Sequence, residues 1–192
     1  MRGDLERVLF DEPAIHRRLD DIAAQISNDY RELDLTVIAV LHGSLMFVAD
    51  LLRRIPLPLK LDCLSVASYH GKAQSGGEVV FKLATTSPSG GGQITLPDVG
   101  GRDILVLDDI LDSGFTLAAV RETLETARPH SLRICVLLSK KKQRAREVDA
   151  DYIGFEIEDE FVVGYGLDFR ERYRNLPYIG VLRRELLEQP GK

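Results

Sequence analysis

Two apolar runs, rich in β-branched residues, constrain the fold of this 192-residue chain more than any other feature. Residues 36–41 are followed by a short loop with Gly43 and by a helical stretch at 45–54, and residues 104–107 by a polar loop at 108–115 and a helical stretch at 116–126. A third run covers residues 132–138. Apolar strands that alternate with helices are typical of a parallel sheet with helices on both faces. The sequence therefore predicts an α/β fold with an open, mainly parallel, doubly wound sheet.

An amphipathic helix is predicted near the N-terminus. Pro13, preceded by two acidic residues, marks its start. The apolar residues that follow share one helix face: Ile15, Leu19, Ile22, Ala23, Ile26 and Tyr30. A chain of this length is expected to form one domain, residues 1–192, with a well-buried core.

The charge balance limits the partners of the chain. There are 30 acidic against 25 basic residues, a formal net charge of −5, which gives no broad attraction to nucleic acid or to anionic lipid. The first residues lack the apolar segment of a signal peptide, and no run of about 18 apolar residues could span a bilayer. We therefore expect a cytoplasmic protein that binds neither nucleic acid nor membrane and holds any anionic ligand in a local site.

Two glycine-containing stretches, 70–77 and 87–92, bracket a candidate strand at 79–84. Their composition predicts a hairpin-like excursion from the sheet. It is either a lid over a site or a solvated surface hairpin, and composition alone does not choose between the two.

The strongest chemical signal is the polar stretch that follows residues 104–107. In a doubly wound sheet, ligands bind beyond the carboxyl ends of the strands. Residues 112–116 can point backbone N–H groups and two hydroxyls at a phosphate, aided by the dipole of the next helix. Asp108 and Asp109 suit sugar hydroxyls or metal-bound waters. The alternative is a solvated strand end whose residues cap the helix.

The stretch VLDDILDSGFTL, residues 106–117, resembles the phosphoribosyl-pyrophosphate (PRPP) signature of type I phosphoribosyltransferases, and the chain from residue 37 to 182 resembles bacterial hypoxanthine (hypoxanthine-guanine) phosphoribosyltransferases. The matching motifs occur in the family's order: LHGS at 41–44, MFVADL at 46–51, Ser68-Tyr69, Lys140, IGFEI at 153–157, FVVGYGLDF at 161–169 and RYRNLPYIG at 172–180. The resemblance implies the type I fold, with a small hood region and a flexible lid loop. It also implies a Mg²⁺-dependent enzyme of purine salvage that joins a 6-oxopurine to PRPP, giving IMP or GMP and pyrophosphate.

The resemblance further implies roles for particular residues. Asp112 is the expected general base near N7 of the purine. Lys140 offers three donors and no acceptor, which suits the O6 atom of a 6-oxopurine and not the amine of adenine. The full expected site comprises the PRPP-binding residues His42, Gly43, Ser44, Ser68, Tyr69, Asp108, Asp109, Asp112, Ser113, Gly114, Phe115, Thr116 and Arg174, the purine-binding residues Lys140, Phe161, Val162 and Asp168, and the metal ligands Asp108, Asp109 and Asp168.

Two segments have an implied backbone role. In the family, the loop matching residues 41–44 often contains a non-proline cis peptide that turns N–H groups toward pyrophosphate. Ser68 and Tyr69 match the dipeptide that closes over bound substrate, so the resemblance favours the lid interpretation of the excursion. Closure would exclude water from the reacting centre.

The chain departs from the family pattern at three positions. It has His42 where Lys or Arg is common, Asp108 where Glu is common, and Phe115 where Lys or a polar residue is common. Two alternative functions therefore stay open: a phosphoribosyltransferase that prefers xanthine, and a catalytically weak regulator that senses PRPP. Because the family forms dimers and tetramers, we expect a homodimer or a homotetramer.

The His42 departure generates a testable prediction. A histidine side chain has an ordinary pKa of about 6.5, so the positive charge that it offers to pyrophosphate is lost as pH rises through neutrality. The Michaelis constant (KM) for PRPP should therefore rise from mildly acidic to mildly alkaline pH, and less so in a His42→Lys variant. A flat profile, or identical behaviour of the variant, would show instead that the loop works through its backbone N–H groups.

Overall fold

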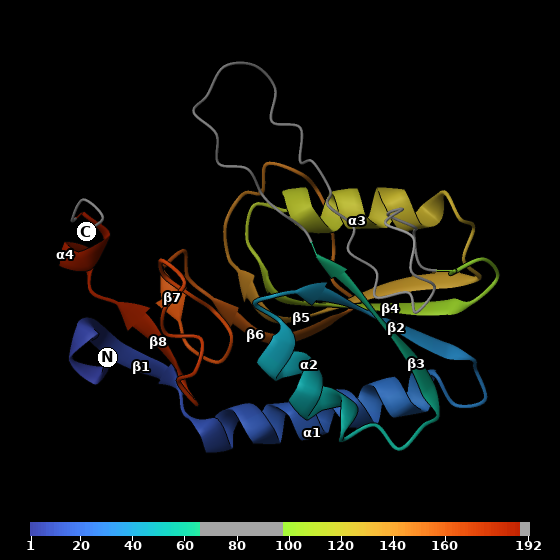
Figure 1. Cartoon of the computed structure of the whole chain (residues 1–192), viewed down its shortest axis with the longest axis horizontal. Coiled ribbons are helices and arrows are strands. Elements are labelled where there is room, and N and C mark those ends of the chain that lie inside the picture. The colour runs from blue at the N-terminus through green and yellow to red at the C-terminus, as the bar shows by residue number, and fades with distance from the viewer. Residues whose placement is uncertain (66–97, 189–192) are drawn as a thin grey trace, which may run out of the picture.

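The computed structural model describes residues 1–65 and 98–188 (Figure 1). Five parallel strands form the main sheet in the order β3-β2-β4-β5-β6. Their bounds are β2 (Leu35–Leu41), β3 (Leu59–Ser65), β4 (Asp103–Leu111), β5 (Ser131–Lys140) and β6 (Tyr152–Ile157). The predicted α/β fold with an open parallel sheet is confirmed.

Helices cover both faces of this sheet. Figure 1 shows α1 (Glu12–Asp29) and α2 (Leu45–Leu52) on one side and α3 (Phe115–Glu125) on the other. The predicted amphipathic helix is α1; Asp11 caps it by accepting a 2.9 Å hydrogen bond from the N–H of Ala14. The predicted apolar face of α1 is buried, from Ile15 to Tyr30.

The core consists of two layers because successive residues of a strand point to opposite faces. On β2, Val37 and Ala39 pack with α1 and α2, whereas Ile38 and Val40 pack with α3. Both sets of side chains are almost fully buried. This burial on two faces explains why the strands appear in the sequence as continuous apolar runs.

A small antiparallel sheet forms the hood region beside β6 (Figure 1). It has the order β1-β8-β7, with β1 (Leu5–Phe10), β7 (Val162–Val163) and β8 (Ile179–Leu182). A 3₁₀ turn (Arg2–Asp4) precedes it and α4 (Arg184–Leu187) follows it. Phe10 of β1 stacks on Phe155 of β6, with ring centroids 3.9 Å apart. The hood is thus attached to the main sheet through its apolar side chains.

The candidate lid at 70–92 lies outside the described residues. Within the described part of the chain, no helix is both long enough and apolar enough to cross a bilayer.

The contact between β5 and β6 generates a prediction about stability. A Cβ atom added to Gly154 of β6 would lie 2.3 Å from the carbonyl oxygen of Leu137 on β5. Gly154→Ala must therefore push the two strands apart, and it should lower the free energy of unfolding by about 2 kcal/mol. Gly3→Ala is the control, because a Cβ atom there has no neighbour within 4 Å. Urea unfolding would measure both, and equal stability of the two variants would contradict the packing described.

Candidate functional site

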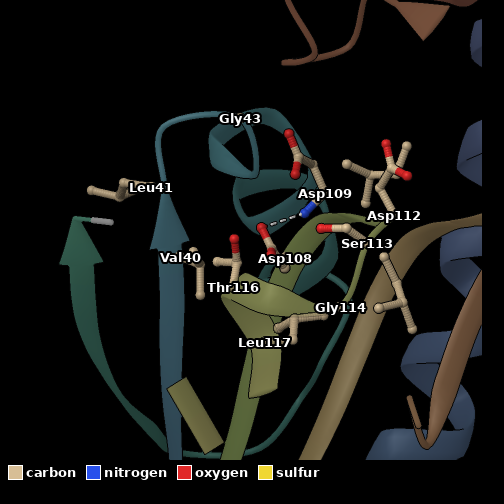
Figure 2. Close-up of a pocket in the computed structure, with 12 residues that line it drawn as sticks. Val40, Leu41, Gly43, Asp108, Asp109, Asp112, Ser113, Gly114, Thr116 and Leu117 are labelled. Carbon is tan, nitrogen blue, oxygen red and sulfur yellow. Dashed lines mark hydrogen bonds between the residues drawn. The ribbon is translucent and has the colours of Figure 1, made fainter. Parts of the chain in front are cut away.

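A cavity of about 210 Å³ opens at the carboxyl ends of β2 and β4 (Figure 2). This is the edge at which a parallel doubly wound sheet binds ligands. The residues lining it come from the two strand ends and from the loop that leads into α3: Val40, Leu41, Gly43, Asp108, Asp109, Ile110, Leu111, Asp112, Ser113, Gly114, Thr116 and Leu117.

Two adjacent carboxyl groups, those of Asp108 and Asp109, line this cavity. Asp108 is buried, and its Oδ1 accepts a 2.9 Å hydrogen bond from the backbone N–H of Asp109, the dashed line in Figure 2. Burial raises the pKa of Asp108 well above its ordinary value, and the neighbouring Asp109 adds to the rise. Burial also raises the pKa of Asp109, although hydrogen bonds from the Asp108 side chain and from backbone N–H groups, and lastly the charge of Arg174, oppose this rise. Because both residues line the cavity, their carboxyl oxygens can accept further hydrogen bonds from a ligand.

The loop at 112–116 has a fixed shape. Gly114 lies in the left-handed region, with φ of 85°, and a Cβ atom there would come 2.2 Å from the carbonyl oxygen of Arg146. The backbone N–H groups of Ala145 and Arg146 both donate to the carbonyl oxygen of Ser113, at 3.1 and 3.2 Å. Only glycine fits at 114, and α3 then begins at Phe115. The first N–H groups of α3 have no partner within the helix and lie next to the cavity.

The loop at 41–44 forms the opposite wall. The Leu41–His42 peptide is cis, as the family resemblance suggested. Gly43 leaves no room for a side chain, since a Cβ atom would overlap the carboxylate of Asp109. The hydroxyl of buried Ser44 donates to the carbonyl oxygen of Val40, and the side chain of His42 is exposed.

A third segment, from the hood, reaches the same loop. A Cβ atom on Gly166 would lie 2.0 Å from the carbonyl oxygen of Gly43, so the two backbones are in direct contact. Arg174 donates through Nη1 to the carbonyl oxygen of Gly166 at 2.7 Å and pairs through Nη2 with Asp168, also at 2.7 Å. The predicted residues Asp168 and Arg174 are therefore direct partners.

A cluster of four charges lies beside the loop at 112–116. The ammonium group of Lys140, whose side chain is only 9% exposed, lies 3.0 Å from Oδ2 of Asp112 and 3.1 Å from Oδ1 of Asp159. Lys142 contacts the same two carboxylates. Burial opposes ionisation of Asp112, but hydrogen bonds from Lys142 and Lys140 outweigh it and hold its pKa below the ordinary value. Asp112 is therefore ionised at neutral pH.

The aromatic part of the predicted site is formed in the hood. Phe161, 40% exposed, lies edge-on to Phe169 with ring centroids 5.5 Å apart. Val162 is buried in β7, and the carbonyl oxygen of Phe161 accepts a hydrogen bond from the N–H of Leu182 at 2.9 Å. The Phe161 ring is thus fixed by the hood while one part of it faces solvent.

Only some of the predicted site residues line the cavity. The predicted residues that line the cavity are Gly43, Asp108, Asp109, Asp112, Ser113, Gly114 and Thr116. His42, Ser44 and Phe115 are adjacent in sequence but do not line it, and Ser68 and Tyr69 lie outside the described residues. Lys142 and Asp159 were not predicted, because a lysine run at 140–142 is typical of a solvated surface and Asp159 belongs to no motif.

Among the described residues, no group of three or more His, Cys, Asp or Glu side chains could hold a metal ion without other ligands. The carboxylates that could contribute to a shared site are Asp108 and Asp109 in the cavity and Asp168 in the hood. A hard cation here would therefore need further oxygen ligands from a bound substrate.

Comparison with known proteins gives a consistent result. A hypoxanthine-guanine phosphoribosyltransferase from Staphylococcus epidermidis is 43% identical over 190 residues, which cover 97% of this chain and 98% of the relative. One from Staphylococcus aureus is 41% identical over 187 residues, with the same coverage. The crystal structure of a hypoxanthine phosphoribosyltransferase from Staphylococcus aureus superposes with a TM-score of 0.88 at 40% identity, covering 98% of this chain and 97% of that one.

A hypoxanthine-guanine-xanthine phosphoribosyltransferase structure superposes with a TM-score of 0.81 at 32% identity, covering 94% of this chain and 99% of that one. The family model of the phosphoribosyl transferase domain matches residues 8–170. This match spans the residues that line the cavity and includes β7 of the hood. The chain therefore belongs to the phosphoribosyl transferase family.

Proposed function

We propose that this protein transfers the phosphoribosyl group of PRPP to hypoxanthine or guanine and releases pyrophosphate, a reaction of purine salvage. The observation that carries the proposal is the cavity at one sheet edge, where the carboxyl groups of Asp108 and Asp109 meet the 112–116 loop, whose Asp112 pairs with Lys140. The curated relatives, at 41–43% identity over nearly the whole chain, support the same reaction.

PRPP would bind across the cavity. The loop at 112–116 offers N–H groups, two hydroxyls and the dipole of α3 to the 5′-phosphate. Asp108 and Asp109 accept hydrogen bonds from the ribose hydroxyls. The backbone of the 41–44 loop and the guanidinium of Arg174 face the pyrophosphate, which is the leaving group.

Magnesium is the proposed cofactor. Asp108, Asp109 and Asp168 are hard oxygen donors of the kind that Mg²⁺ prefers, and substrate oxygens would complete its coordination. When bound, the ion neutralises charge on pyrophosphate. Arg174 of the chain does the same from its own side, and it holds Asp168 in place through their 2.7 Å ion pair.

The purine would bind between Phe161 and Lys140. The exposed part of the Phe161 ring offers a stacking surface, and the backbone of Val162 offers hydrogen bonds to the base edge. Lys140 donates to O6, which requires its ammonium group to leave the Asp112 carboxylate that it contacts without substrate. The N9–C1′ bond then forms as the C1′–O bond to pyrophosphate breaks, and the proton on N7 passes to Asp112. Lys142 keeps its ion pair with Asp112.

Two further properties belong to this proposal. We place the enzyme in the cytoplasm, where purine bases and PRPP are available, and we expect a homodimer or homotetramer. Sedimentation of the purified protein would measure its oligomeric state, and a monomer at micromolar concentration would contradict that expectation.

Lys140 provides the test of the function. With PRPP and Mg²⁺, the protein should form nucleotide from hypoxanthine and guanine and little from adenine. Lys140→Ala should raise the KM for hypoxanthine by about tenfold or more, because a charge-assisted hydrogen bond to O6 is lost. Absorbance changes on nucleotide formation would measure both.

Lys141→Ala is the matched control. Its exposed ammonium group pairs with Glu158 at 3.7 Å. It should leave the KM for hypoxanthine unchanged. Equal effects of the two variants would contradict the proposed base contact. Faster turnover of xanthine than of hypoxanthine would instead support the xanthine-preferring alternative.

A further inference from the structure

We propose that Tyr165 and Asp50 are positioning residues, whose hydrogen bond holds the hood segment 164–168 against the 41–44 loop and so fixes the pyrophosphate half of the PRPP site. The inference rests on the proposed function and deepens it. Neither residue lines the cavity, and neither would touch a reacting atom.

The hydrogen bond between Tyr165 and Asp50 is short, and Tyr165 is buried. The hydroxyl of Tyr165 donates to Oδ2 of Asp50 at 2.6 Å, and Tyr165 is only 5% exposed. Burial raises the pKa of Tyr165, and the hydrogen bond to Asp50 raises it further, so the phenol stays protonated as a donor. Tyr165 also has φ of 51°, in the left-handed region that non-glycine residues rarely occupy. The unusual backbone conformation and the buried side chain together fix the position of Tyr165.

At one end the bond is linked to the 41–44 loop. Asp50 lies on α2, which begins at Leu45 directly after that loop. The first hydrogen bond of this helix, from the N–H of Val48 to the carbonyl oxygen of Ser44 at 2.8 Å, joins the loop to the helix. The position of α2 therefore determines the position of the loop.

At its other end the bond is linked to Arg174 and Asp168. The N–H of Tyr165 donates to the carbonyl oxygen of Leu176 at 2.8 Å, and the N–H of Gly166 to that of Arg174 at 2.9 Å. Arg174 returns a hydrogen bond to the carbonyl oxygen of Gly166 at 2.7 Å. Because Gly166 also touches Gly43, a shift of Tyr165 would move both sides of the pyrophosphate site relative to each other.

The hydroxyl can be removed without leaving a carboxylate unpaired. Arg53 contacts Oδ1 of Asp50, and Nε2 of His16 lies 3.7 Å from its Oδ2. Tyr165→Phe keeps the buried ring and these ion pairs. We therefore expect a folded variant in which only the tie between the hood segment and α2 is lost.

Tyr152→Phe is a matched control. The hydroxyl of Tyr152 donates to Asp29 at 2.7 Å, and Tyr152 is also 5% exposed. This bond lies at the amino end of β6, the edge of the sheet opposite the cavity. The Tyr152 hydroxyl also accepts a 2.7 Å hydrogen bond from Arg133, so Tyr152→Phe should lower stability at least as much as Tyr165→Phe does.

Steady-state kinetics would separate positioning from stability. Tyr165→Phe should raise the KM for PRPP by roughly tenfold and change the KM for hypoxanthine by less than about twofold. Tyr152→Phe should change neither. Asp50→Ala should reproduce the effect of Tyr165→Phe, and the double variant should add nothing to either single one, as expected for partners in one bond. Asp50→Asn, which keeps an oxygen to accept the hydrogen bond, should restore most of the affinity.

Other outcomes would overturn the inference. These are an unchanged KM for PRPP, an equal rise for hypoxanthine, a similar effect of Tyr152→Phe, or additive effects in the double variant. Titration calorimetry with PRPP and Mg²⁺ should show the same loss of affinity in Tyr165→Phe. A wild-type protein that binds PRPP but turns over no base would refute the proposed function alone, and the calorimetric comparison would still decide on Tyr165 and Asp50.

Discussion

The pair of adjacent carboxyl groups near the end of β4 is the feature on which the rest of the site depends. Asp108 is buried and Asp109 is partly buried at the end of this strand, and burial raises the pKa of both groups. Buried carboxyl groups are costly unless they find donors or cations. The protein supplies part of what they need: the N–H of Asp109 donates to Asp108, backbone N–H groups donate to Asp109, and Arg174 adds its charge. A ligand rich in hydroxyls, accompanied by a cation, would satisfy the pair, and this links the fold directly to a sugar phosphate substrate.

Two contacts between distant segments complete the site around that pair. Gly43 and Gly166 let the 41–44 loop and the hood meet backbone to backbone, and the bond from Tyr165 to Asp50 ties the same parts together. On the base side, Lys140 and Lys142 both neutralise Asp112 in the absence of substrate. Under the proposed function, purine binding would exchange the Lys140 contact for one to O6, which would free Asp112 to accept the proton from N7. Substrate binding and activation would therefore be coupled through a single ammonium group.

The sequence predicted the local elements well where one physical rule dominates. Apolar runs identified β2, β4 and β5, and the spacing of apolar residues identified α1. Strand β3 has exposed and half-buried residues at the sheet edge, and the hood strands are short, so no strong periodicity marks them. For the site, the motif at 106–117 located the cavity because its polar residues follow one strand. The contact of Lys142 with Asp112 and the Tyr165–Asp50 bond each join segments that are distant in the sequence. Asp50 and Tyr165, for example, are 115 residues apart, and no local sequence pattern reveals such contacts.

The central claim is that the cavity, the lysine cluster and the hood form one site for PRPP and a 6-oxopurine. A crystal structure with IMP and pyrophosphate bound would test it most directly. The account predicts the 5′-phosphate on the 112–116 loop, the purine on Phe161, and Lys140 moved from Asp112 to O6 while Lys142 remains on Asp112. A nucleotide bound elsewhere, or one bound in the cavity with Lys140 still on Asp112 and Asp159, would contradict it.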